Sequence, residues 1–173
     1  KTIGIIGLGH IGKELVSLLA PFNCEILIND IIEQKAYCLR NKLISVDKEA
    51  LFARADIITL HTPLTAETQK LVDDKSLAKM RKEAFLINTA RGELVDLLAL
   101  KKALKSGMIS GAAIDVYDNE PPKDKELLSL NNLICTPHIG GNSAEATLAM
   151  GRSAINHLVN YYQFSKQKTD VNL

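Results

Sequence analysis

The fold of this chain is decided by the stretch Thr2-Ile3-Gly4-Ile5-Ile6-Gly7-Leu8-Gly9-His10-Ile11-Gly12. Its apolar first half predicts a β-strand, and its second half is a G-x-G-x-x-G pattern that opens an amphipathic helix. In this context Gly7 can make the tight turn, Gly9 can let a pyrophosphate approach the backbone, and Gly12 can let the helix pack on the strand. Unpaired N–H groups at the helix N-terminus favour phosphate. The stretch therefore predicts a dinucleotide-binding βαβ unit.

The next predicted strand, Glu25–Asn29, ends at an acidic residue, Asp30, which follows Gly12 by 18 residues. A carboxylate at this point can accept hydrogen bonds from the ribose hydroxyls of adenosine and would repel a 2′-phosphate. Ile31 and Ile32 follow in place of Arg or Lys. We therefore expect NAD as the cofactor rather than NADP.

The rest of the chain alternates between short β-rich runs and longer helical patterns. This order predicts an α/β fold with a doubly wound parallel sheet of about seven strands and helices on both faces. Five further strands are expected at Leu43–Ser45, Asp56–Leu60, Ala84–Asn88, Gly111–Asp115 and Leu133–Cys135. Helices are expected at His10–Ala20, Glu33–Arg40, Lys48–Ala55, Ser76–Met80, Val95–Lys105 and Ser143–Tyr162, and an irregular loop at Tyr117–Leu130.

Composition excludes several other classes of protein. The 173 residues suit one domain, and 21 Lys and Arg against 20 Asp and Glu leave no positive field for nucleic-acid binding. No apolar run approaches the roughly 20 residues of a membrane span. Cys24, Cys38 and Cys135 form no paired motif, and no residues have metal-ligand spacing, so we expect core cysteines, no metal and a cytoplasmic location.

Unusual polar residues follow the predicted strands, whose carboxyl ends meet at one edge of a doubly wound sheet. Arg91 offers a planar cation that can bind a carboxylate. His138 can exchange a proton near neutral pH, and Glu120 can pair with the imidazolium and raise its pKa. Asp115 remains for the nicotinamide end of a cofactor. Together these residues predict a centre that interconverts a ketone and an alcohol.

Further cofactor contacts are expected from the glycine-rich turn and the strand ends. They are His10, Ile11, Thr62, Pro63, Thr89, Ala90, Gly140 and Gly141, with Arg91 and His138 also near the cofactor. His61 is expected to support its loop, and His157 to be structural.

The ordered motifs resemble those of the D-isomer-specific 2-hydroxyacid dehydrogenases over nearly the whole chain. They are Gly7-Leu8-Gly9-His10-Ile11-Gly12, His61-Thr62-Pro63-Leu64-Thr65, Asn88-Thr89-Ala90-Arg91-Gly92, Asp115-Val116-Tyr117 with Glu120-Pro121, and Thr136-Pro137-His138-Ile139-Gly140-Gly141. The resemblance implies a Rossmann-type fold that binds NAD. It places the substrate-binding arginine at Arg91, the acid/base histidine at His138 and its paired glutamate at Glu120. It also places the ribose-binding acid at Asp30 and the carboxamide-binding acid at Asp115.

Family members have two domains, so residues 1–173 are expected to be the NAD-binding domain, with the substrate domain absent from this chain. Such a domain should bind NAD(H) but turn over a small 2-hydroxy or 2-oxo acid poorly, because half of the cleft is missing. The resemblance also implies a homodimer in the full-length protein. Two alternatives stay open at this point: an NAD(H)-sensing protein similar to certain transcriptional corepressors, and an enzyme similar to formate dehydrogenase. Which 2-hydroxy acid is used cannot be read from these residues.

Overall fold

The structure is a computed structural model that describes residues 1–169, with side chains described through residue 163. The chain divides into two compact units, Lys1–Pro137 and His138–Leu173. The first unit contains every strand of the sheet. The second contains one long helix within its described residues.

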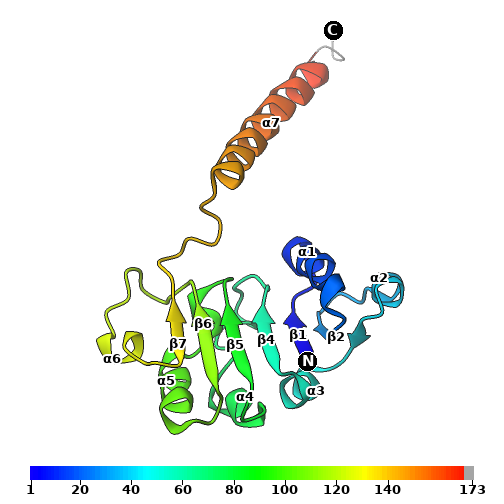
Figure 1. Ribbon diagram of the computed structural model, residues 1–173. Helices are drawn as coiled ribbons and strands as arrows, with labels where there is room; N and C mark the ends of the chain where they lie inside the picture. Colours follow the sequence, from blue (N-terminus) through cyan, green and yellow to red (C-terminus); the bar gives the residue numbers. More distant parts are fainter. Residues whose placement is uncertain (170–173) are drawn as a thin grey trace. The chain divides into compact units, whose positions relative to one another are not determined.

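The first unit is built on a seven-stranded, fully parallel sheet with the strand order β3-β2-β1-β4-β5-β6-β7 (Figure 1). The strands are β1 (Thr2–Ile6), β2 (Glu25–Asn29), β3 (Ile44–Ser45), β4 (Ile57–Leu60), β5 (Phe85–Asn88), β6 (Gly111–Ile114) and β7 (Leu133–Cys135). The order reverses beside β1, between the halves that run outward to β3 and to β7. The predicted doubly wound sheet is confirmed.

Helices connect the strands at nearly all of the predicted places. They are α1 (His10–Leu19), η1 (Ala20–Phe22), α2 (Lys35–Arg40), α3 (Lys48–Arg54), α4 (Asp74–Lys79), η2 (Gly92–Leu94), α5 (Leu97–Ser106) and α6 (Lys125–Leu128). The short helix α6 was not expected, because residues 117–130 read as an irregular loop. It begins where the Asp124 side chain accepts a hydrogen bond from the Leu127 N–H at 3.0 Å.

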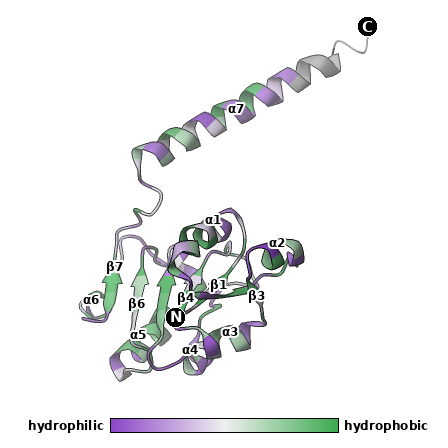
Figure 2. Ribbon diagram, turned by 45° about the vertical axis from the view of Figure 1, so that its right-hand side comes forward, coloured by the Kyte–Doolittle hydropathy of each residue, from purple (hydrophilic) through white to green (hydrophobic). Residues whose placement is uncertain are grey.

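Side chains of the central strands pack on both faces of the sheet, which is why these strands read as continuous apolar runs. Along β2, Ile26 and Ile28 belong to the core cluster that includes Val16 of α1, whereas Leu27 points to the other face. That other face holds the larger cluster, which includes Leu100 of α5. Figure 2 shows β7 in green, for hydrophobic residues.

The strands on the β7 side of the sheet are buried unequally on their two faces. Leu86 and Leu133 are buried in the larger cluster, whereas Phe85 and Ile134, the adjacent residues of β5 and β7, are 48% and 69% exposed. In the part of the sheet formed by β5, β6 and β7, the larger core cluster therefore lies on the face that carries Leu86 and Leu133.

Helix α7 (Ala144–Thr169) dominates the second unit and extends past the predicted end at Tyr162. Ser143 precedes it, and its Oγ accepts a hydrogen bond from the Ala146 N–H at 3.1 Å. In the described part of the chain, no helix combines the length and the apolar character that a membrane span needs.

Candidate cofactor-binding site

The glycine-rich turn leaves β1 in a conformation that needs glycine at two of its three glycine positions. Gly7 has a φ of 98°, and a Cβ atom there would lie 2.7 Å from the carbonyl of His61. A Cβ atom on Gly12 would lie 2.3 Å from the carbonyl oxygen of Gly7, so helix α1 can approach the turn only without a side chain. At Gly9, by contrast, a Cβ atom would meet nothing within 4 Å. The turn is therefore tightly enclosed on the protein side and open at Gly9.

Asp30, at the end of β2, accepts two backbone hydrogen bonds. Its Oδ2 accepts from the Leu8 N–H at 2.5 Å, and its Oδ1 accepts from the Ile32 N–H at 2.7 Å. A carboxylate has about four acceptor positions, so both oxygens keep capacity for further donors. Asp30 thus ties the glycine-rich turn to β2 and can still bind ribose hydroxyls.

A cavity of about 490 Å³ lies at this carboxyl edge of the sheet. It brings together five of the predicted cofactor residues, namely Gly7, Gly9, Asp30, Thr62 and Pro63. Its volume is within the range of small-molecule sites. The remaining lining residues are Ile6, Asn29, Ile31, Ile32, Lys48, His61, Thr65, Glu67, Thr68 and Leu71. A second cavity, of about 500 Å³ beside α5, contains none of the predicted site residues.

Thr68, which the sequence analysis did not identify, shapes the part of the cavity lined by Pro63 and Thr65. Thr68 Oγ1 accepts a hydrogen bond from the Thr65 N–H at 2.7 Å and donates one to the Pro63 carbonyl at 2.8 Å. These two bonds hold Pro63 and Thr65 against the cavity. The signal that could have identified Thr68 is its position three residues after the His61–Thr65 motif, where a hydroxyl can close a turn.

The polar groups around the cavity fit a dinucleotide. Thr62 lines the cavity, and its Oγ1 is buried without a hydrogen-bond partner among the described residues, which is unusual for a buried hydroxyl. Gly9 is the N-cap of α1 and carries no capping side chain, which leaves donors of the first helical turn for an anion. Together with the carboxylate of Asp30, the site therefore combines backbone N–H donors with acceptor oxygens, the groups that phosphates and a sugar need.

His61 borders the same cavity and supports its wall. Its Nε2 lies 3.0 Å from the Thr59 hydroxyl, and burial lowers the pKa of its imidazole. The ring therefore stays neutral at physiological pH. The backbone N–H of His61 also donates to the Ile6 carbonyl at 2.8 Å.

Arg91 lies on a tight turn after β5 that Asn88 holds closed. Asn88 is fully buried, its Nδ2 donates to the Arg91 carbonyl at 2.8 Å, and its Oδ1 accepts from the Ala90 N–H at 3.1 Å. The Arg91 side chain is exposed and donates to the Ala90 carbonyl at 2.5 Å. The turn thus presents a cation at the carboxyl edge of the sheet.

The residues after β6 form a second polar segment at this edge. Asp115 is buried and accepts from the hydroxyl of Thr136. Glu120 accepts from the Tyr117 N–H at 3.1 Å. Gly92 approaches the same segment so closely that a Cβ atom there would lie 2.1 Å from the carbonyl carbon of Tyr117. Arg91 and this segment are therefore held in adjacent loops.

The cavity does not include all of the predicted residues. His10 and Ile11 are exposed at the start of α1 and do not line it. The other predicted residues of the first unit outside its lining are Gly12, Thr89, Ala90, Arg91, Asp115 and Glu120. His138, Gly140 and Gly141 belong to the second unit, and their roles stay predictions. Among the described residues, no group of three His, Cys, Asp or Glu side chains could hold a metal.

Comparison with known proteins identifies the family. The model of the D-isomer specific 2-hydroxyacid dehydrogenase NAD-binding domain matches residues 1–140. D-3-phosphoglycerate dehydrogenase of Methanocaldococcus jannaschii is 44% identical over 153 residues, which cover 87% of this chain and 29% of that protein.

Two solved structures share the fold. One is a D-isomer specific 2-hydroxyacid dehydrogenase from Lactobacillus delbrueckii ssp. bulgaricus in its NAD-complexed form, with a TM-score of 0.83, 30% identity, and coverage of 94% of this chain and 53% of that one. The other is an acyclic imino acid reductase in complex with NADPH and D-Arg, with a TM-score of 0.86, 33% identity, and coverage of 94% and 51%. This chain thus spans about half the length of these solved proteins. Because the family model matches most of its residues, the chain belongs to the D-isomer specific 2-hydroxyacid dehydrogenases, as an NAD-binding domain.

Proposed function

We propose that this chain is the cofactor half of an NAD-dependent dehydrogenase that interconverts a small D-2-hydroxy acid and its 2-oxo acid. The observation that carries the proposal is the cavity whose lining brings together the open Gly9, Asp30 with its carboxylate, and Thr62. This set matches the phosphates and ribose of a dinucleotide. Family membership supports the class of reaction.

NAD is the proposed cofactor because of Asp30. Lys48 is the lysine in the lining of the cavity, but a 2′-phosphate would meet the Asp30 carboxylate, and neither Ile31 nor Ile32 beside it offers a positive charge. Both an NAD complex and an NADPH complex occur among the structural neighbours. The preference therefore rests on these three residues and not on the fold.

Three residues have proposed roles in the reaction. The nicotinamide ring, when bound, supplies or accepts the hydride. Arg91 binds the substrate carboxylate through two parallel hydrogen bonds, since its guanidinium is planar and always charged. His138 donates a proton to the carbonyl oxygen during reduction and takes it back during oxidation. Glu120 pairs with the imidazolium and stabilises its charged form.

The remaining proposals concern the whole protein. Residues 1–173 form the NAD-binding domain of a two-domain enzyme whose substrate domain lies outside this chain, and the full-length protein is a homodimer. Sedimentation of the full-length protein at two concentrations would check the dimer. The cytoplasmic location suggested by the cysteine pattern stays a prediction.

Titration of this chain with NADH, followed by nicotinamide fluorescence, tests cofactor binding. Wild type should bind NADH more tightly than NADPH. Gly9→Ala should weaken NADH binding by about tenfold or more without lowering the thermal midpoint, because Gly9 lines the cavity and a Cβ atom there meets no protein atom within 4 Å. Gly151→Ala, on helix α7, is the matched control and should leave NADH affinity unchanged. Absence of NADH binding would overturn the proposal, and equal affinity for both dinucleotides would overturn the NAD preference.

A turnover assay tests the division of the active site. With NADH and hydroxypyruvate, glyoxylate or pyruvate, this chain should turn over poorly, because one side of the substrate cleft is missing. The full-length protein should be active with at least one member of such a panel. Normal turnover by residues 1–173 would show that no second domain is needed.

A further inference from the structure

Leu8, between Gly7 and Gly9, is the most constrained residue of the glycine-rich turn. Its side chain is 1% exposed and packs in the core cluster below α1 and α2. Its N–H donates to Asp30 Oδ2 at 2.5 Å, and its carbonyl accepts from the Nε2 of Gln34 at 2.9 Å. Both polar groups of Leu8 are therefore held by side chains that follow β2.

Gln34 uses its side chain for the turn and not for its own helix. It is the N-cap residue of α2, but its side chain makes no capping hydrogen bond. The helix instead uses its main chain, since the Cys38 N–H donates to the Gln34 carbonyl at 3.0 Å. The side-chain amide of Gln34 is half-buried, and its hydrogen bond joins it to Leu8, 26 residues earlier in the chain. This amide therefore stabilises the glycine-rich turn and not helix α2.

The bond from Gln34 determines the direction of one phosphate-facing donor. The Leu8 carbonyl and the Gly9 N–H belong to the same planar peptide, in which the two groups point in opposite directions. Gly9 lines the cavity, and none of the residues that the structure describes provides an acceptor for its N–H. Holding the Leu8 carbonyl on the protein side therefore holds the Gly9 N–H in one orientation before any ligand arrives.

We propose that Gln34 is a positioning residue for the diphosphate of the cofactor, acting through the Leu8 carbonyl on the Gly9 N–H. The inference rests on the proposed function, because it assumes that a dinucleotide occupies the cavity. Without Gln34 the peptide can rotate, and the ligand must order it on binding, which weakens affinity. The effect is confined to ligands that carry phosphates.

Gln34→Met tests this role, because methionine keeps the length of the side chain and removes the donor. Competition against NADH on the whole chain would measure the affinity for ADP-ribose, which carries the diphosphate, and for adenosine, which does not. We expect ADP-ribose to bind about fivefold more weakly to Gln34→Met, with adenosine affinity unchanged. Equal weakening of both ligands, or of neither, would overturn the proposal.

Asn41→Leu is the matched control. Its Nδ2 donates to the Tyr37 carbonyl at 2.9 Å, so this variant also removes an amide-to-carbonyl bond on α2, but away from the turn. ADP-ribose affinity should stay unchanged in this variant. A loss as large as in Gln34→Met would show that general loosening of α2 is responsible.

A measurement without ligand separates this inference from the proposed function. In nitrogen-15 NMR spectra, Gln34→Met should shift the Gly9 amide resonance and speed its hydrogen exchange, whereas Asn41→Leu should not. An unchanged Gly9 amide in Gln34→Met would overturn the positioning role, whether or not NADH binds. Failure of wild type to bind NADH would overturn the proposed function and with it the role of Gln34 toward the diphosphate, whereas the Gly9 amide by itself tests whether Gln34 orients the turn.

Discussion

The hydroxyl of Thr136 donates a hydrogen bond to Asp115 Oδ1 across 2.5 Å, and this bond joins the carboxyl ends of β7 and β6. Asp115 is only 5% exposed. The carbonyl of the same threonine accepts from the Tyr117 hydroxyl at 3.1 Å, and burial raises the pKa of that phenol, so it remains a donor. Thr136 is thus bound on two sides, two residues before His138 in the sequence.

Thr136→Val should destabilise the first unit by about 1–3 kcal/mol, because the valine deprives a buried carboxylate of a donor. Thr136→Ser retains the hydroxyl and should recover most of the free energy of unfolding. Urea denaturation of the two variants and wild type would measure the difference. Equal stability of Thr136→Val and wild type would mean that the bond contributes nothing net.

Asn88→Leu should lower the free energy of unfolding by about 1–3 kcal/mol, because it removes both hydrogen bonds that close the turn before Arg91. Asn88→Asp keeps an acceptor for the Ala90 N–H but lacks the donor to the Arg91 carbonyl. Its free energy of unfolding, measured in urea, should therefore fall between those of wild type and Asn88→Leu. If Asn88→Asp is as stable as wild type, the donor is not needed.

Gly12→Ala should lower stability by about 1–3 kcal/mol or more, since the new Cβ atom would press on the backbone of Gly7 and force α1 away. Gly151→Ala provides the comparison, because a Cβ atom there meets nothing within 4 Å and alanine favours the helix. Thermal unfolding followed by circular dichroism would measure both. A Gly12→Ala variant as stable as wild type would contradict the close approach of helix and turn.

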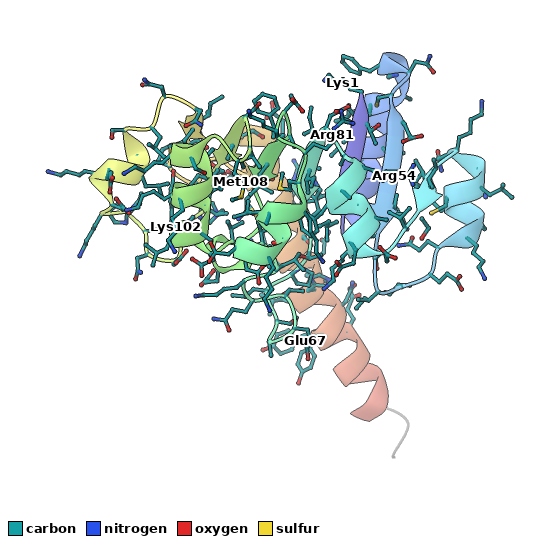
Figure 3. The ribbon with its side chains drawn as sticks, turned by 90° about the horizontal axis from the view of Figure 1, so that it is seen from below. Lys1, Arg54, Glu67, Arg81, Lys102 and Met108 are labelled. Carbon is teal, nitrogen blue, oxygen red and sulfur yellow. The ribbon has the colours of Figure 1, made fainter. Side chains whose placement is uncertain are left out.

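The carboxylate of Asp56 should make the free energy of unfolding decrease at acid pH. Its carboxylate accepts from the Thr2 N–H at 2.8 Å, and this bond, together with the positive charges of Lys1 and Arg81, holds its pKa below the usual value. Lys1 and Arg81 are labelled in Figure 3. A lowered pKa in the folded state adds stability above the unfolded pKa of about 3.9, and this stability is lost as the pH falls through the folded value.

Asp56→Asn removes that titration. Between pH 5 and pH 3, the free energy of unfolding of wild type should therefore decrease more steeply than that of Asp56→Asn, as measured by urea denaturation at each pH. Glu14→Gln, at an exposed position on α1, is the control and should follow wild type. Parallel pH profiles for wild type and Asp56→Asn would contradict the role of Asp56.

Local patterns were sufficient for most elements of the fold. The strands Thr2–Ile6, Glu25–Asn29 and Leu133–Cys135 have the bounds that their apolar runs predict. Helix α6 could not be predicted in this way. It has only four residues. Its stabilising ion pairs are made with α5, more than 20 residues away: Lys101 pairs with Asp124 and Glu126, and Lys105 pairs with Glu126.

The sequence by itself determined the glycine-rich turn, the acid at the end of β2 and the family, because these depend on residue type and short spacing. Only the tertiary structure decided that Gly9 is open while Gly7 and Gly12 are enclosed, and that Gln34 holds Leu8. The physical reason is that Gly7 is enclosed by His61, and Leu8 is held by Gln34, only after the parallel sheet has brought these distant residues together, whereas Gly12 meets Gly7 within the folded turn itself. Contacts across 20 or more residues exist only after the strands have paired and their carboxyl ends have met at one edge.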